Sequence, residues 1–235
     1  MHSAPPPRQP GLDVPLHEVR FVVLDVETTG GSPGDAALVE VGAAALSGGE
    51  QLEVFESLVD PASPVPPFVA GLTGITDDMV RGAPAPAAVP PRLRELIGGG
   101  VVVGHNVGFD LGFLDAGLER LGLPRIDNPV VDTLGLARRL VRDLSPNCGL
   151  HSLAVSLRLE HRPAHRALAD ALATADLLHR LIELSTGYGV LRLDDLLALP
   201  DRLSPIPLSA AGSLALSEAA DAPPWTETAP TLAPA

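Results

Sequence analysis

The sequence contains no lysine, and all 16 of its basic residues are Arg. Cys148 is its single cysteine, which excludes an internal disulfide framework and a cysteine-based zinc site. No apolar run reaches 18 residues, so a membrane-spanning helix is not expected. The proline-rich start also lacks the apolar segment of a secretory signal. Together these absences predict a soluble, cytoplasmic protein with no membrane partner.

Aromatic residues make up 3% of the chain, whereas hydrophobic residues make up 46%. The predicted core is therefore built from Ala, Leu and Val. The 29 acidic residues outnumber the 16 basic ones, which gives a formal net charge of −13. This balance argues against a protein that coats nucleic acid non-specifically, but it allows an enzyme that handles one strand end.

Proline is concentrated at both ends of the chain. Five of the 25 prolines lie in residues 1–15 and seven lie in residues 200–235. Neither end shows hydrophobic periodicity, which is typical of disorder. We therefore expect a flexible segment over residues 1–18, one domain over 19–199 and a disordered tail over 200–235.

The middle of the chain alternates between strand and helix patterns. Short apolar runs bounded by turn residues predict strands at 19–26, 37–46, 51–59, 101–103 and 129–131. Apolar residues at helical spacing predict helices at 92–97, 109–121, 133–141, 150–157 and 167–185. The Gly-containing turn at 47–50 predicts a hairpin. This order of elements favours an α/β fold with a mixed sheet.

Two acidic residues, Asp25 and Glu27, end the first predicted strand. Their spacing places both carboxylates on one face of the strand, with Val26 on the other. Neighbouring carboxylates repel unless a cation lies between them, and a hard divalent ion such as Mg²⁺ suits them. The small residues at 28–30 would let a phosphate or sugar approach the backbone. The alternative is a strand end with two ordinary solvated charges.

Asp110 and Asp170 are two further candidates. Asp110 lies near the start of a predicted helix, where the helix dipole favours a carboxylate. It could also be an ordinary helix-start charge, with Asn106 as the cap. Asp170 lies among Ala and Leu on a predicted helix, which disfavours an unpaired charge, although a solvated face is the alternative. His105 and His165 each precede one of these Asp residues by five positions, so spacing leaves open which histidine is the base.

The four carboxylates are more specific as a set than singly. If the sheet brings Asp25, Glu27, Asp110 and Asp170 together, they could hold two Mg²⁺ ions. Two metal ions about 4 Å apart could clamp the attacking and leaving oxygens of a phosphodiester displacement.

Three segments resemble the motifs of a known family. DVETTG at 25–30, HNVGFD at 105–110 and HRALAD at 165–170 resemble, in this order, the three motifs of the DEDDh group of 3′→5′ exonucleases. That group includes the epsilon proofreading subunit of bacterial DNA polymerase III. The resemblance extends from Val19 to Ile182. It implies a ribonuclease H-like fold, with a five-stranded mixed sheet and helices on both sides.

The resemblance also implies a catalytic set. Asp25, Glu27, Asp110 and Asp170 would carry two Mg²⁺ ions, with Mn²⁺ as a substitute, and His165 would be the general base for the attacking water.

Substrate-binding and supporting roles fall on six further positions. By the same resemblance, Thr28 and Thr29 would contact the terminal nucleotide beside Gly30, and His105 and Asn106 would support the site. Arg166, adjacent to His165, is the best placed of several Arg residues to line a channel for the strand.

The predicted activity is metal-dependent hydrolysis at single-stranded or frayed DNA 3′ ends. It would release nucleoside 5′-monophosphates in proofreading or repair, with a DNA polymerase subunit as a candidate partner. An exoribonuclease with the same residues is one alternative, because recognition of a 2′-OH depends on pocket shape. The other is a catalytically silent module that binds a polymerase or a strand end. The intact carboxylates argue against the silent module.

Overall fold

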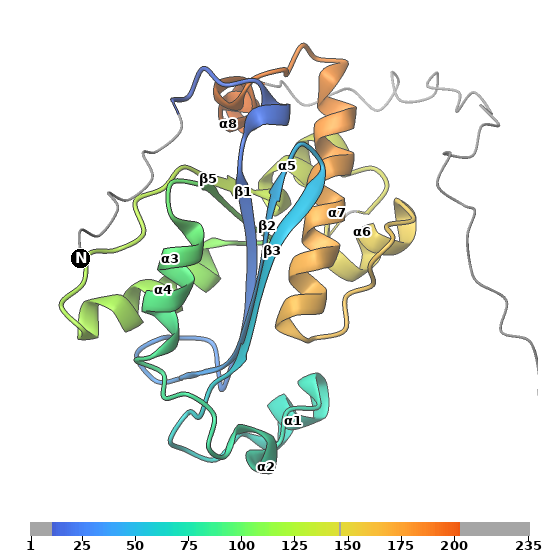
Figure 1. Cartoon of the computed structure of the whole chain (residues 1–235). Helices are drawn as coiled ribbons and strands as arrows, with labels where there is room; N and C mark the ends of the chain where they lie inside the picture. The colour runs from blue at the N-terminus through green and yellow to red at the C-terminus, as the bar shows by residue number, and fades with distance from the viewer. Residues whose placement is uncertain (1–10, 146, 203–235) are drawn as a thin grey trace, which may run out of the picture. The chain divides into compact units, whose positions relative to one another are not determined.

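The computed structural model describes residues 11–145 and 147–202. Its centre is a five-stranded sheet in the order β3-β2-β1-β4-β5 (Figure 1). The strands are β1 (Phe21–Thr28), β2 (Leu38–Ser47), β3 (Glu50–Leu58), β4 (Val101–Gly104) and β5 (Val130–Asp132). β1 pairs antiparallel with β2 and parallel with β4, so the sheet is mixed. The predicted α/β fold with a five-stranded mixed sheet is confirmed.

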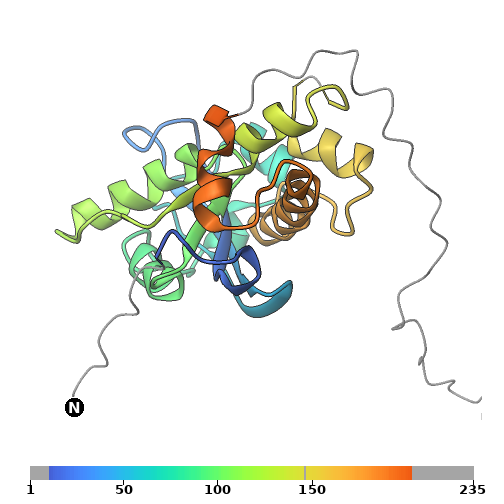
Figure 2. The same ribbon diagram turned by 90° about the horizontal axis from the view of Figure 1, so that it is seen from above.

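Helices cover both faces of this sheet, as Figures 1 and 2 show. One face packs against α3 (Val89–Ile97) and α4 (Gly108–Arg120). The other packs against α5 (Thr133–Leu140), α6 (Leu150–Ser156), α7 (Ala167–Thr186) and α8 (Leu193–Arg202). Three short helices complete the described residues: η1 (Leu16–Glu18), α1 (Pro67–Thr73) and α2 (Asp77–Val80).

The alternation of side chains along β1 produces these two cores. Val22, Leu24 and Val26 face α3 and α4, whereas Phe21 and Val23 face α7. Continuous apolar runs such as 21–24 are expected for a strand that is covered on both sides.

No helix within the described residues is long and apolar enough to cross a membrane.

Helix α7 lies directly on β2 because Gly42 has no side chain. A Cβ atom at this position would lie 2.2 Å from the backbone N of Leu168. Gly42 also pairs with Asp25 of β1 in the sheet register. The missing side chain therefore brings the first turn of α7 against the end of the central strand.

The two ends of the domain differ from the expectation. Part of the segment 1–18 is packed: the backbone N–H of Leu16 donates to Leu191 O at 3.0 Å, and that of Leu193 donates to Val14 O at 2.9 Å. The predicted domain end at 199 falls inside α8, a helix that the sequence analysis did not predict. Residues 1–10 and 203–235 lie outside the described residues.

Gly42→Ala is expected to destabilise the fold by about 1–3 kcal/mol, because its methyl group would collide with the backbone of α7. Gly71→Ala on α1 is the matched control, since a Cβ there meets nothing within 4 Å. Its free energy of unfolding should stay within about 1 kcal/mol of the wild type. Denaturant unfolding of both variants measures the difference, and equal stabilities would contradict the close approach.

Candidate active site

The first two acidic residues lie at the end of the central strand β1. Asp25 and Glu27 point to the face covered by α7, and Val26 packs into the opposite core. This confirms the predicted separation of the three side chains. The β1–β2 register shifts between Glu27 and Thr28, so the regular strand ends beside the second carboxylate.

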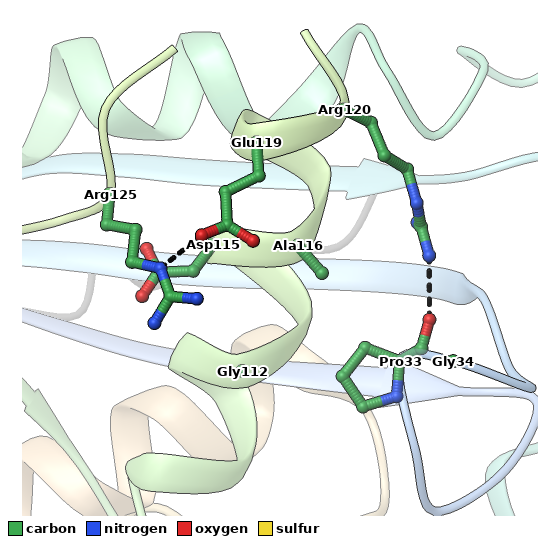
Figure 3. Close-up of a pocket in the computed structure, with 8 residues that line it drawn as sticks. All are labelled: Pro33, Gly34, Gly112, Asp115, Ala116, Glu119, Arg120 and Arg125. Atoms are coloured by element: carbon green, nitrogen blue, oxygen red, sulfur yellow. Dashed lines mark hydrogen bonds and ion pairs between the residues drawn. The ribbon is translucent and has the colours of Figure 1, made fainter. Parts of the chain in front are cut away.

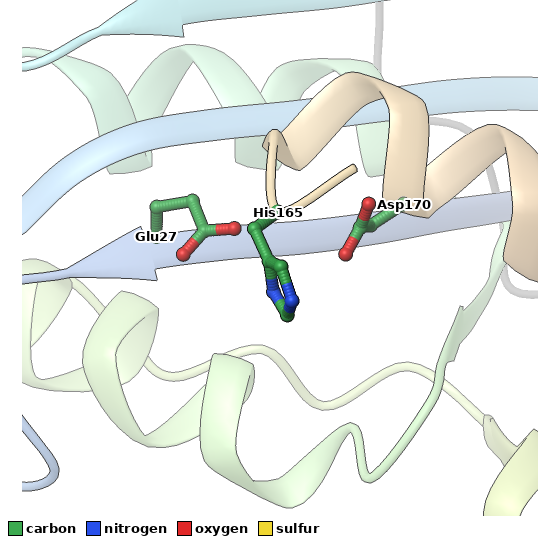
Figure 4. A group of neighbouring side chains, drawn as sticks. All are labelled: Glu27, His165 and Asp170. Atoms are coloured by element: carbon green, nitrogen blue, oxygen red, sulfur yellow. The ribbon is translucent and has the colours of Figure 1, made fainter. Parts of the chain in front are cut away.

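His165 and Asp170 approach from the start of α7. Glu27, His165 and Asp170 each offer a ligand atom, and these atoms all lie within 4.8 Å of one another (Figure 4). Asp170 is 8% exposed, and its Oδ1 accepts a hydrogen bond from the N–H of Ala164 at 2.8 Å. That bond turns the loop before α7 back toward the helix. His165 is solvent-exposed, so water can reach its ring.

Asp110 enters from the other side of the sheet. It lies in the first turn of α4 and is 4% exposed. Its Oδ1 accepts a hydrogen bond at 3.0 Å from the backbone N–H of Val26. Because Val26 lies between Asp25 and Glu27 in sequence, this bond fixes the start of α4 beside both carboxylates. Asn106 does not cap α4, since no side-chain hydrogen bond caps that helix.

Burial and mutual repulsion disturb the ionisation of this cluster. Burial, followed by the charges of Asp110 and Asp170, raises the pKa of Asp25 well above its ordinary value. Burial, followed by the charge of Asp170, raises the pKa of Glu27 to about 7. Burial also raises the pKa of Asp110 to about 7, against the opposing effect of the Val26 N–H bond. Oxygen donors gathered in this way fit a hard divalent cation, which would restore their ionised forms.

His105 lies in a different environment from His165. Its Nδ1 is 3.0 Å from Thr133 Oγ1, and its Nε2 is 2.9 Å from the carbonyl oxygen of Cys148. Burial lowers the pKa of this imidazole. Both ring nitrogens are therefore engaged inside the protein, whereas His165 adjoins the carboxylates. Asn106 adopts a left-handed conformation (φ 70°) and donates its backbone N–H to Asp132 Oδ1 at 2.8 Å.

Residues 28–30 form the turn that leaves β1. The hydroxyl of Thr28 donates to Gly30 O at 2.7 Å. The hydroxyl oxygen of Thr29 accepts from the N–H of Ala37 at 2.9 Å. The turn is thus closed by its own side chains beside the acidic cluster.

Arg166 is held by Glu40, a carboxylate that is not among the predicted site residues. Its guanidinium donates to Glu40 of β2, with Nη2 2.6 Å from Oε1. Glu40 is 1% exposed in the strand Leu38–Ser47, whose other residues are nearly all apolar. A charged residue inside such a run signals a buried partner, but the sequence does not say which one.

A pocket of about 580 Å³ lies between α4 and the loop after β1 (Figure 3). Its charged side chains are bonded locally: Arg120 donates to Pro33 O at 2.7 Å, and Arg125 pairs with Glu119. Asp115 accepts from the N–H of Ile126. None of the predicted catalytic or substrate-binding residues lines this pocket, so it is distinct from the carboxylate cluster.

A five-stranded mixed sheet with acidic residues at the end of its central strand defines a ribonuclease H-like nuclease fold. The family model RNase_T, described as exonuclease, matches residues 22–178. The chain belongs to this exonuclease family.

Two curated relatives and two solved structures are similar to the chain. A Mycobacterium tuberculosis protein described as a bifunctional exonuclease/endonuclease is 43% identical over 77% of this chain and 29% of its own length. A PolC-type DNA polymerase III of Halalkalibacterium halodurans is 40% identical over 78% of this chain and 13% of its own length. The chain therefore spans less than a third of either relative.

The solved structures agree with the fold. Exonuclease X in complex with 5′-overhanging duplex DNA has a TM-score of 0.58 and 25% identity, covering 77% of this chain and 99% of that one. E. coli exonuclease I in complex with a dT13 oligonucleotide has a TM-score of 0.64 and 22% identity, covering 73% of this chain and 43% of that one.

The raised pKa values predict that the metal-free protein loses stability as the pH rises. The folded-state values of Glu27 and Asp110 are about 7, above the ordinary 4.5 and 3.8. The stability that proton binding contributes is therefore complete below about pH 4 and is lost as the pH approaches 7. Thermal unfolding in EDTA should give a lower Tm at about pH 7.5 than at about pH 5.

Added Mg²⁺ or Mn²⁺ should raise the Tm more at about pH 7.5 than at about pH 5, because a bound cation favours ionised carboxylates. Asp25→Asn should reduce this shift. Glu53→Gln, on the exposed part of β3, is the matched control and should retain it. A Tm that responds to neither pH nor metal would contradict a cation site here.

Proposed function

We propose that the protein is a metal-dependent 3′→5′ exonuclease that removes nucleoside 5′-monophosphates from single-stranded or frayed DNA 3′ ends. The observation that carries this proposal is the approach of Glu27, Asp170 and His165 to within 4.8 Å of one another. Two carboxylates beside an exposed imidazole provide metal ligands and a proton acceptor in one place. DNA polymerase III and DNA-bound exonucleases among the similar proteins support DNA as the substrate and proofreading or repair as the setting.

Four carboxylates, those of Asp25, Glu27, Asp110 and Asp170, would hold two Mg²⁺ ions, for which Mn²⁺ could substitute. When bound, the ions would stabilise charge on the phosphodiester oxygens and make the attacking water more acidic. The support is the donor set itself, because oxygen ligands of this kind suit Mg²⁺. The raised pKa values of Asp25, Glu27 and Asp110 provide a second reason, since a cation relieves the repulsion that contributes to them.

His165 would accept the proton of the attacking water. It adjoins Glu27 and Asp170, and its exposed ring can pass the proton to solvent. His105 is unsuited to this step because Thr133 and Cys148 occupy both of its ring nitrogens. We assign it a supporting role, in which it links the end of β4 to neighbouring segments.

The terminal nucleotide would bind beside the turn that leaves β1. Thr28, Thr29 and Gly30 lie directly after Glu27, and Gly30 has no side chain to obstruct a sugar or phosphate. Asn106 is exposed at the end of β4 and would contact the substrate from the other side. A DNA polymerase subunit remains the proposed partner, on the strength of the PolC-type relatives.

The test is digestion of 5′-labelled single-stranded DNA, 3′-recessed duplex DNA and RNA, each with Mg²⁺, Mn²⁺ or EDTA. We expect metal-dependent shortening of DNA from its 3′ end, with nucleoside 5′-monophosphate as the product. Faster shortening of RNA would instead identify an exoribonuclease. Absence of product on every substrate with both metals would refute the enzymatic proposal and leave the binding module.

His165→Ala is expected to lower kcat by about 10²- to 10⁴-fold, because the water loses its proton acceptor. The affinity for DNA should change by less than about threefold, since the metal ligands remain. Single-turnover digestion and DNA binding measure the two effects. His151→Ala, an exposed histidine of α6, is the control and should cleave at the wild-type rate. Wild-type cleavage by His165→Ala would show that another group accepts the proton.

A further inference from the structure

Glu40 is a buried carboxylate that the proposed reaction does not use. It lies in β2 between Val39 and Val41, and it is 1% exposed. A carboxylate in such a place persists only where charged or hydrogen-bonding partners compensate for the loss of water. Those partners therefore indicate what Glu40 does.

Among the described residues, the two that follow His165 donate hydrogen bonds to the Glu40 carboxylate. Arg166 Nε is 3.0 Å from Oε1 and 3.1 Å from Oε2, and Nη2 is 2.6 Å from Oε1. The backbone N–H of Ala167 donates to Oε2 at 2.8 Å. Ala167 is the first residue of α7. One carboxylate thus fixes both a guanidinium and a free N–H at the start of this helix.

His165 itself has an unfavourable backbone. Its φ is 52°, a left-handed conformation that few residues other than Gly adopt. Such a conformation persists when neighbouring contacts enforce it. On one side, Ala164 donates its N–H to Asp170. On the other, Arg166 and Ala167 donate to Glu40, so the residues on both sides of His165 are hydrogen-bonded.

The sheet register places Glu40, which anchors the start of α7, beside the candidate site. Glu40 lies opposite Glu27 in the β1–β2 pairing, and Gly42 lies opposite Asp25. The strand β2 therefore presents an acceptor for the loop and, two residues on, the bare backbone that lets α7 approach. Both features act on the segment that carries His165 and Asp170.

We propose that Glu40 is a positioning residue for His165: through Arg166 and the Ala167 N–H it holds the imidazole in place for proton transfer. The proposal rests on the proposed role of His165 as the base. In this proposal Arg166 acts through its ion pair with Glu40 rather than by lining a strand channel.

The experiment compares single-turnover cleavage by Glu40→Gln with that by Glu56→Gln. Glu56 lies 4.0 Å from the same guanidinium but is half exposed on β3, so its variant removes a neighbouring charge without removing the anchor. We expect Glu40→Gln to lower kcat by about tenfold or more, with KM for DNA and the Mg²⁺ requirement changed by less than about threefold. Glu56→Gln should remain within about twofold of the wild type.

A double-mutant cycle separates positioning from a general loss of structure. In the His165→Ala background, Glu40→Gln should cause no further loss of kcat, because there is no imidazole left to orient. An equal loss in both backgrounds, or a normal kcat for Glu40→Gln alone, would overturn the proposal. An inactive wild type would refute the proposed function itself, which is a separate outcome.

Arg166→Lys is the second variant, to be used if circular dichroism shows that Glu40→Gln is unfolded. It retains the positive charge but loses the planar fork that reaches both carboxylate oxygens. We expect the same pattern: a lower kcat, a nearly unchanged KM and no additional effect without His165. An additive effect in that background would refute the positioning role.

Discussion

The mutual repulsion of partly buried carboxylates is the constraint on which the rest of this structure depends. Asp25, Glu27, Asp110 and Asp170 come from the central strand and from two helices on opposite faces of the sheet. Each helix start is fixed by a specific contact: Asp110 accepts the Val26 N–H, and α7 packs on the bare backbone of Gly42. These contacts hold the acids together against repulsion, which adds to the effect of burial in raising the pKa values of Asp25, Glu27 and Asp110. The scaffold therefore preorganises the oxygen donors of the proposed cation site.

Two histidines that each precede an Asp by five positions lie in different environments in the folded protein. His105 is enclosed between Thr133 and the Cys148 carbonyl, and burial lowers its pKa. His165 lies on the exposed loop before α7, next to two carboxylates. One histidine therefore joins segments of the fold, and the other is available for chemistry. The spacing of both from an Asp is identical, so the distinction arises from tertiary structure.

Much of the sheet could be predicted from the sequence because local patterns determine it: an apolar run that ends in acidic residues located β1, and the glycine turn located the hairpin of β2 and β3. For Asp110 and Asp170 local patterns left an ordinary charge open, and the family resemblance grouped them with the end of β1. The pairing of Glu40 with Arg166 could not be predicted, since the two residues are 126 positions apart and no periodicity relates them. The same holds for the bond from Val26 to Asp110 and for the packing of residues 14–16 on the segment before α8.

That last packing brings the two described ends of the domain together. Pro15 forms a bridge with Arg192, and Leu193 donates to Val14, next to the beginning of β1. Asp25 and Glu27 lie toward the opposite end of this strand, which runs from Phe21 to Thr28. These contacts thus hold the start of the central strand at the end away from the carboxylates.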